Sequence, residues 1–175
     1  MNVGRKLAFA AIAVTLGALA TTAQARTSWK MHSAWGSSVP HLGTNAWRFA
    51  ENIGRMSGGE FTVKAFEPGA LIPANEGFDA TSKGSIEMAW TTAGYDTGKY
   101  PALSFFTAVP FGPSIGEYMA WKMFGGGDVL EEEIYNAHGI HKIDCLAIGP
   151  ETSGWFKEEI KELEQLRGLK MRFFG

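Results

Sequence analysis

The chain has 175 residues, of which 45% are hydrophobic, 19% charged and 13% aromatic, and it contains one cysteine. This composition excludes a disordered, collagen-like or disulfide-stapled protein. The 16 basic and 18 acidic residues give a formal charge of −2, so the chain lacks the broad basic surface that binding to nucleic acid or to anionic membranes requires. We therefore expect no nucleic-acid partner.

Residues 1–25 have the pattern of a cleavable secretory signal peptide. Arg5-Lys6 is a short positive region, Leu7 to Ala20 is an apolar stretch, and Ala23-Gln24-Ala25 supplies a small-x-small cleavage site. As a helix, the apolar stretch would reach only about 21 Å, short of the roughly 30 Å hydrocarbon core of a bilayer. An uncleaved transmembrane anchor is therefore the weaker alternative, and the sequence predicts export and cleavage.

The first part of the mature chain reads as strand, helix, strand. Trp29 to Trp35 predicts a strand. Apolar residues then recur at helical spacing from Leu42 to Met56, and Ser57-Gly58-Gly59 is typical of a helix C-terminus. Phe61 to Phe66 alternates with the period of a strand. This order predicts a βαβ unit.

A second crossover follows. Pro68-Gly69 breaks the chain, and Glu76 to Lys83 has the pattern of a short helix with Phe78 on its buried side. Ile86 to Trp90 predicts a third strand. Such alternation of strands and helices is typical of an α/β protein with a parallel sheet.

Two further helices are predicted after an irregular segment. Residues 91–113 are rich in Gly, Thr and Phe, carry three prolines and read mainly as a loop. A capping box at Ser114 opens a helix to about Phe124. The same signature at Asp128 opens a helix that ends near His138.

The remainder of the chain is predicted to cross from one lobe to another. Ile140 to Ile148 is a strand candidate, and Gly149-Pro150 marks a lobe boundary. Lys161 to Arg167 reads as a short charged helix. Leu169 to Phe173 reads as a final strand whose apolar content requires partners on both sides.

These elements predict three parts: a signal peptide over 1–25, a first lobe over 26–148, and a hinge with the start of a second lobe over 149–175. On this interpretation the chain is the N-terminal portion of a longer, two-lobed α/β protein. Ligands of such proteins bind in the cleft between the lobes, beyond the carboxyl ends of the strands.

Arg172 is the first candidate for a ligand-binding residue. It lies in a predicted strand of otherwise mostly apolar residues, so its guanidinium must find either water or a fixed anion. A planar guanidinium matches a carboxylate through two parallel hydrogen bonds. The alternative is an edge-strand arginine in solvent or in a structural ion pair.

Three further residues are candidates for the same cleft. Glu151 follows the lobe boundary, where it could hold a ligand hydroxyl or supply one oxygen to a hard cation; the alternative is a solvated loop acid. Tyr95 lies in a glycine-flanked turn after the third predicted strand, and Trp35 begins the loop after the first. Both fall at the carboxyl ends of strands, where clefts form, although simple packing is the alternative for both.

The sequence lacks the usual enzymatic motifs. It contains no G-x-S-x-G elbow, no phosphate-binding G-x-x-x-x-G-K-S/T loop and no cysteine set for a metal cluster. His138 and His141 have a metal-ligand spacing, but Gly139 interrupts the helix between them. We therefore predict a binding protein and not an enzyme, with a secreted hydrolase as the catalytic alternative.

Four ordered motifs run through the mature segment: FEPGALIP at 66–73, VPFG at 109–112, GWFKEEI at 154–160 and LRGLKMR at 166–172. Together they resemble the solute-binding component of tripartite ATP-independent periplasmic (TRAP) transporters. The resemblance implies a periplasmic-binding-protein-like "Venus flytrap" fold, in which two α/β lobes close on an organic acid.

The resemblance also implies roles for the candidate residues. Arg172 matches the arginine that clamps the ligand carboxylate, and Tyr95 matches an aromatic residue of the pocket. The nearest branch binds 2-oxo acids and related hydroxy-monocarboxylates, some with a bound cation. At the position of Glu151 that branch often has a glutamine that contacts ligand and cation. The family thus implies no required cofactor, but it allows a sodium or calcium ion that bridges to the ligand, with Glu151 as one metal ligand.

The function implied by the resemblance is capture of an organic acid in the periplasm, either a 2-oxo acid, a hydroxy-monocarboxylate or a dicarboxylate. The acid would then pass to TRAP membrane permease subunits driven by an ion gradient. A homodimer is compatible with this function. The alternative is the extracytoplasmic ligand-sensing module of a signalling system, which uses a similar fold without a transporter.

Overall fold

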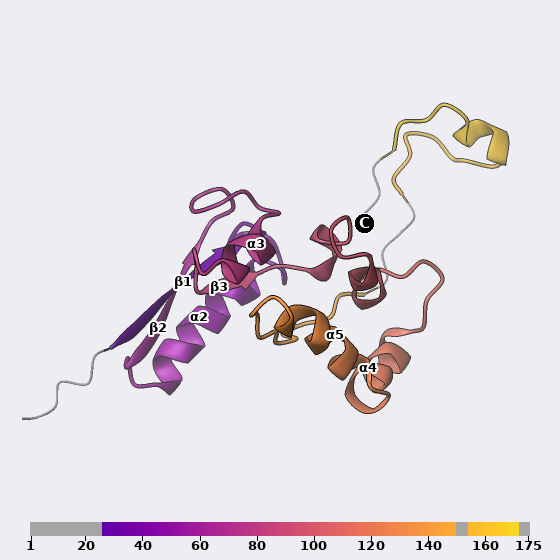
Figure 1. Ribbon diagram of the computed structural model, residues 1–175. Helices are drawn as coiled ribbons and strands as arrows, with labels where there is room; N and C mark the ends of the chain where they lie inside the picture. The colour runs from indigo at the N-terminus through magenta and orange to yellow at the C-terminus, as the bar shows by residue number, and fades with distance from the viewer. Residues whose placement is uncertain (1–25, 150–153, 172–175) are drawn as a thin grey trace, which may run out of the picture.

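The computed structural model describes residues 26–149 and 154–171. They form an α/β fold around a three-stranded parallel sheet with strand order β2-β1-β3 (Figure 1). β1 spans Thr27–Ser33, β2 spans Phe61–Phe66 and β3 spans Met88–Trp90. The predicted α/β class is therefore confirmed. Among these residues, no helix combines the length and the apolar character needed to cross a membrane.

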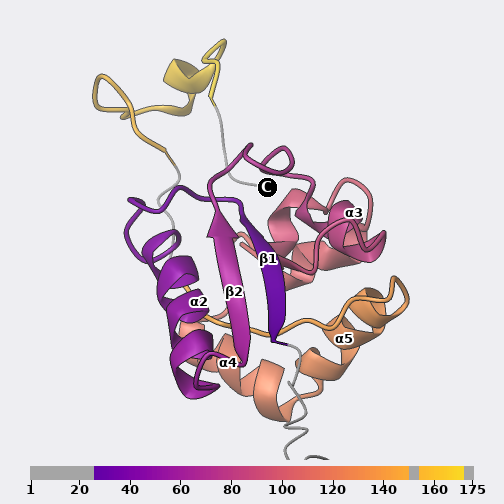
Figure 2. The same ribbon diagram turned by 90° about the vertical axis from the view of Figure 1, so that its left-hand side faces the viewer.

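The sheet and the helix α2 (Thr44–Met56) share the first hydrophobic core. β1 is the central strand and pairs with β2 along nearly its whole length, as predicted for a βαβ unit. The buried side chains between the sheet and α2 are Met31, Ala46, Ala50 and Trp90. Because side chains alternate across a strand, the neighbours of Met31 point to the opposite face of β1. Figure 2 shows α2 and the helix α3 (Gly77–Ser82) on either side of β1 and β2.

A second core lies around α3. Phe78 of α3 packs with Ala93 and Leu103 from the irregular segment after β3, and Leu103 is completely buried. The helix α5 (Gly127–Asn136) contributes Tyr135 to the same cluster. The Ser82 hydroxyl donates a 2.8 Å hydrogen bond to the carbonyl that follows α5, at residue 138. These contacts fix α3 and α5 against the loops that leave β3.

The two predicted helix starts after residue 113 have different outcomes. The helix α4 (Ile115–Phe124) begins with the predicted capping box, in which the Ser114 hydroxyl accepts from the Glu117 N–H and the Glu117 carboxylate accepts from the Ser114 N–H. The predicted box at Asp128 is wrong, because α5 begins at Gly127 and its N-cap is Gly126 (φ 87°), two residues before Asp128. The Glu131 carboxylate that would have completed the box contacts two lysines instead.

The prediction of a strand over Ile140 to Ile148 is also wrong. Residues 141–149 have no regular secondary structure, and no described strand pairs with them. An extended segment needs a hydrogen-bonded neighbour to become part of a sheet, whatever its apolar content. The predicted helix over Lys161 to Arg167 is reduced to a single 3-10 turn, Leu163–Leu166. Residues 169–171 of the predicted final strand are irregular, and its last residues lie outside the described part of the chain.

Candidate functional site

Two of the candidate binding residues meet at the carboxyl edge of the sheet. Trp35 follows β1 and Tyr95 follows β3, and these strands are neighbours with the same direction. The two rings lie with centroids 6.1 Å apart and planes inclined by 33°. Both side chains are half-buried. The pair therefore forms an aromatic surface at the edge where ligands of open α/β sheets bind, although the role of either residue in binding stays a prediction.

The backbone of Trp35 is fixed by the end of β1. The completely buried Ser33 hydroxyl donates to the Trp35 carbonyl at 2.7 Å and accepts from the Trp35 N–H at 3.3 Å. The next strand contributes as well, since the Ala34 N–H donates to the carbonyl of Trp90 at 3.0 Å. The buried Ser33 side chain therefore fixes the direction in which the backbone leaves the sheet at Trp35.

The loop after Trp35 is tightly wound. The Val39 N–H donates to the Gly36 carbonyl at 2.9 Å, and the Gly43 N–H donates to the Val39 carbonyl at 3.0 Å. This winding brings residue 43 so close that a Cβ there would lie 1.8 Å from the Gly36 oxygen. The indole N–H of Trp90 holds the far end of the loop through a 2.8 Å bond to the Leu42 carbonyl.

Glu67 links this loop to the end of β2. It is the first residue after β2, and its carboxylate accepts the Ser37 N–H with distances of 3.1 Å to Oε2 and 3.4 Å to Oε1. Glu67 lies in the motif FEPGALIP at 66–73, but no role was predicted for it. Its position directly after a strand and before Pro68-Gly69 was the available signal.

Two buried polar side chains lie behind the edge. His32 is completely buried on β1; its Nε2 lies 3.3 Å from the Ala74 carbonyl, and Nδ1 has no hydrogen-bond partner among the described residues. Asp96 is 3% exposed, and its Oδ1 likewise has no partner there. Burial raises the pKa of Asp96 to about 6, against the opposing charge of Lys99. His32 helps to hold the segment before α3. Burial of Asp96, in contrast, disfavours its ionised form and so costs free energy of folding at neutral pH.

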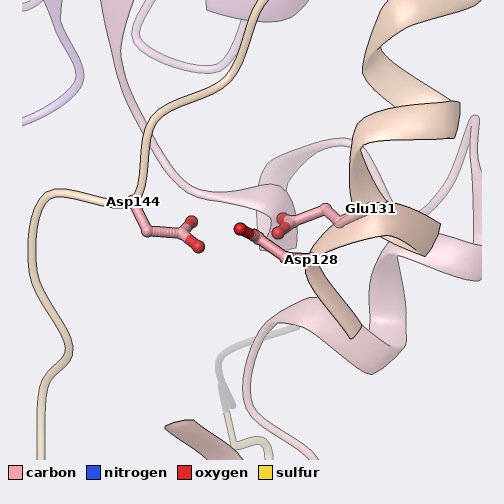
Figure 3. A group of neighbouring side chains, drawn as sticks. All are labelled: Asp128, Glu131 and Asp144. Atoms are coloured by element: carbon pink, nitrogen blue, oxygen red, sulfur yellow. The ribbon is translucent and has the colours of Figure 1, made fainter. Parts of the chain in front are cut away.

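A second cluster of titratable groups lies away from this edge, where α4 and α5 meet the irregular segment 141–149. The carboxylates of Asp128, Glu131 and Asp144 point toward one another (Figure 3), with ligand atoms within 4.8 Å. Such a triad resembles a cation site in its oxygen donors. Two ammonium groups, however, already lie among these carboxylates.

The lysines of this cluster come from α4 and from the irregular segment. Lys122 Nζ contacts Glu131 and lies 3.1 Å from both Asp128 and Asp144. Lys142 Nζ contacts Asp128 and lies 2.8 Å from Asp144 and 2.9 Å from Glu131. Burial acts to lower the pKa of Lys142, but the surrounding carboxylates outweigh it and raise the pKa. The hydrogen bond from Lys142 lowers the pKa of Asp128 in turn. The cluster is therefore an ion-pair network that ties three segments together.

The other two candidate residues cannot be placed relative to this edge. Arg172 and Glu151 lie outside the described residues. Their predicted roles as carboxylate clamp and cation ligand stay predictions. The described part of the site is thus the aromatic pair, with the loops that hold it.

Comparison with protein families matches residues 32–174 to the bacterial extracellular solute-binding proteins, family 7. A monocarboxylate 2-oxoacid-binding periplasmic protein from Nostoc sp. is 36% identical to this chain over 178 residues. That alignment covers 95% of this chain and 48% of the Nostoc protein. The chain therefore spans about half the length of this relative.

Solved structures agree with this match. A TRAP periplasmic solute-binding protein from Colwellia psychrerythraea, with bound calcium and pyruvate, has a TM-score of 0.80 and 34% identity, over 86% of this chain and 46% of that one. A second, from Pseudoalteromonas atlantica with bound sodium and pyruvate, has a TM-score of 0.75 and 33% identity, over the same shares of the two chains. The described fold is thus that of one part of TRAP solute-binding proteins.

Proposed function

Because the chain belongs to family 7 of the bacterial extracellular solute-binding proteins, we propose that it captures a small organic acid in the periplasm and delivers it to a TRAP membrane permease. The observation that carries the proposal is the aromatic pair Trp35 and Tyr95 at the carboxyl edge of a family-7 sheet. Relatives that match this sheet bind pyruvate. A 2-oxo acid is therefore the first ligand class to test.

The proposed chemistry combines an apolar wall with an anion clamp. The rings of Trp35 and Tyr95 provide a half-buried surface for the carbon skeleton of a small acid. Arg172 supplies the guanidinium that matches the carboxylate through two parallel hydrogen bonds. Closure of two lobes excludes water and strengthens these charge-assisted bonds. Binding and release, without bond breaking, account for the proposed role.

The proposal includes a cation that bridges the Glu151 carboxylate and the ligand carboxylate. Relatives bind either calcium or sodium together with pyruvate. Carboxylate oxygens are ligands for both kinds of hard cation. Glu151 would provide such an oxygen, and the bridging charge would relieve its repulsion of the ligand carboxylate.

The proposed organisation follows the sequence-based division. Residues 1–25 direct export and are removed, residues 26–148 form the first lobe, and residues 149–175 form the hinge with the start of the second lobe. The permease is the membrane partner. Self-association as a homodimer is compatible with this arrangement.

The experiment is titration of purified protein, expressed from its complete coding sequence, with pyruvate, a longer 2-oxo acid and a dicarboxylate, each with and without calcium or sodium. We expect Arg172→Ala to weaken binding by about 2 to 5 kcal/mol, the usual loss when a buried charge pair is broken, or about thirtyfold or more in Kd. Calorimetry measures this change directly.

Arg167→Ala is the matched control, because Arg167 carries the same charge on an exposed side chain five positions earlier. It should bind as the wild type does. If Arg172→Ala bound within threefold of wild type, the clamp assignment would be lost. If the wild-type protein bound none of these acids, the proposed function itself would fail.

A further inference from the structure

We propose that Glu67 is a positioning residue of this site: its carboxylate holds the loop after β1 so that Trp35 stays against Tyr95. The inference rests on the proposed function for its consequence in binding, but the contact itself belongs to the fold. It assigns a role to a residue that would otherwise read as a solvated acid after a strand.

The contact is specific in its geometry. Glu67 reaches across 30 positions of sequence to one backbone N–H, that of Ser37, with both carboxylate oxygens within 3.4 Å of the nitrogen. A Cβ on the neighbouring residue, Gly36, would lie only 3.3 Å from Oε2. The carboxylate therefore packs close against the backbone at the start of the loop, an approach favoured by the absence of a side chain at residue 36.

Trp35 lies between two anchors as a result. On the strand side, the Ser33 hydroxyl bonds both the N–H and the carbonyl of Trp35. On the loop side, Glu67 holds Ser37, two residues beyond Trp35. Without the second anchor, the chain after Trp35 loses its link to β2, and the indole gains freedom to move relative to the ring of Tyr95. Ordering that indole would then fall to the ligand and weaken binding.

The charge of Glu67 matters as well as its reach. A hydrogen bond to an ionised acceptor is stronger than one between neutral groups, although exposure of Glu67 to water reduces the gain. A glutamine keeps an acceptor oxygen at the same distance from the backbone but carries no charge. An alanine removes the acceptor altogether. The two variants therefore separate anchoring from charge.

Glu87 offers a matched control. Its carboxylate also accepts a backbone N–H across strands, from Lys30 at 2.9 Å, and it is also exposed. It lies immediately before β3, at the amino end of that strand and away from the aromatic pair. Glu87→Ala thus removes a bond of the same kind from the same sheet without touching the proposed site.

The test compares Glu67→Ala, Glu67→Gln and Glu87→Ala in the protein expressed from its complete coding sequence. Pyruvate affinity is measured by calorimetry and stability by thermal melting. We expect Glu67→Ala to weaken pyruvate binding about tenfold, as for loss of one charge-assisted hydrogen bond. Glu67→Gln should recover most of that affinity, and Glu87→Ala should bind as the wild type does.

A spectroscopic readout tests the contact independently of any ligand. In wild type, the Ser37 amide proton should exchange slowly with solvent, because it donates to the Glu67 carboxylate. In Glu67→Ala that protection should disappear from the Ser37 amide. The Lys30 amide should keep its protection in both proteins, because its bond to Glu87 is unchanged there.

Three results would overturn the inference. The first is a Ser37 amide that exchanges equally fast in wild type and in Glu67→Ala, and the second is equal loss of affinity in Glu67→Ala and Glu87→Ala, which would show a general loss of stability. The third is loss of calcium or sodium dependence in Glu67→Gln, which would make Glu67 a cation ligand. Absence of pyruvate binding in wild type, with a Ser37 amide that is protected from exchange, would instead reject the proposed function and leave the contact intact.

Discussion

The sheet region (residues 26–140) and the segment 141–171 contain similar fractions of apolar residues. They differ in how completely those side chains are buried. In the first region, paired strands bury Met31 completely, and the packing of α3 and α5 on the loops after β3 buries Leu103 completely. In the second, Trp155 is 91% exposed and Leu163 is 79% exposed, and the backbone of residues 141–149 and 154–171 is mostly irregular. The difference shows that apolar content favours burial only where partner strands or helices are in place.

Truncation of one leucine in each region tests this difference most directly. We expect Leu103→Ala to lower the free energy of unfolding by about 2 to 5 kcal/mol, because it removes a completely buried side chain and leaves a cavity. Leu163→Ala should change it by less than about 0.5 kcal/mol. Urea unfolding of both variants gives the comparison. A loss of similar size in both would mean that the segment 154–171 is packed in solution.

The ion-pair network joins α4 and α5 to Lys142 and Asp144 of the second region, and its removal should have the next largest effect. Lys122→Met deletes a nearly buried ammonium from a cluster of three carboxylates. We expect a loss of about 3 kcal/mol in the free energy of unfolding, because the buried Glu131 keeps fewer compensating charges.

Lys99→Met is the control for that variant. Lys99 pairs with Asp79 at 2.5 Å, but both side chains are partly exposed, so its removal should cost no more than about 1 kcal/mol. Urea unfolding measures the loss in free energy of unfolding for each variant, and the loss should be larger for Lys122→Met than for Lys99→Met. Equal losses would show that the network contributes nothing beyond a surface pair.

A smaller and pH-dependent effect is expected at Asp96, inside the well-packed region. Its pKa is raised to about 6 by burial, with Asp79 reinforcing and Lys99 opposing. The folded protein therefore binds this proton more tightly than the unfolded chain does, so the stabilising contribution is complete at low pH and is lost as the pH rises through about 6. Asp96→Asn should remove that loss and gain about 1 to 2 kcal/mol at pH 7 relative to wild type.

The measurement is the free energy of unfolding of wild type and Asp96→Asn at several pH values from about 3 to about 8, a range that includes both the ordinary and the raised pKa of Asp96. The difference between the two proteins should grow with pH and then level off. A constant difference would mean that Asp96 does not titrate in this window.

Local signals in the sequence predicted much of the sheet region. Three predicted features depend only on residues that are neighbours in sequence, and each is present. They are the helical spacing of apolar residues in α2 with its glycine-rich end, the alternation in β2 and the capping box at Ser114. The predicted strand at Ile140 failed because pairing depends on a partner elsewhere in the chain. The predicted cap at Asp128 failed because α5 begins at Gly127, and lysines from other segments contact the Asp128 and Glu131 carboxylates.

The candidate site divides in the same way. The positions of Trp35 and Tyr95 follow from strand order, since the carboxyl ends of adjacent parallel strands lie together. The contact of Glu67 with Ser37 could not be predicted, because a backbone N–H is available at nearly every residue and nothing in the sequence marks one as the acceptor's target. Family resemblance, and not local pattern, carries the roles of Arg172 and Glu151.

The close approach of Gly43 to the Gly36 carbonyl has a consequence for anyone who would re-engineer ligand preference. A side chain at residue 43 would clash with the Gly36 carbonyl, so the backbone of the loop would have to shift. Combinatorial libraries should therefore diversify the exposed residues 38–41 and leave Gly36 and Gly43 unchanged. New ligand selectivity would then be sought without a change in the winding of the loop between Gly36 and Gly43.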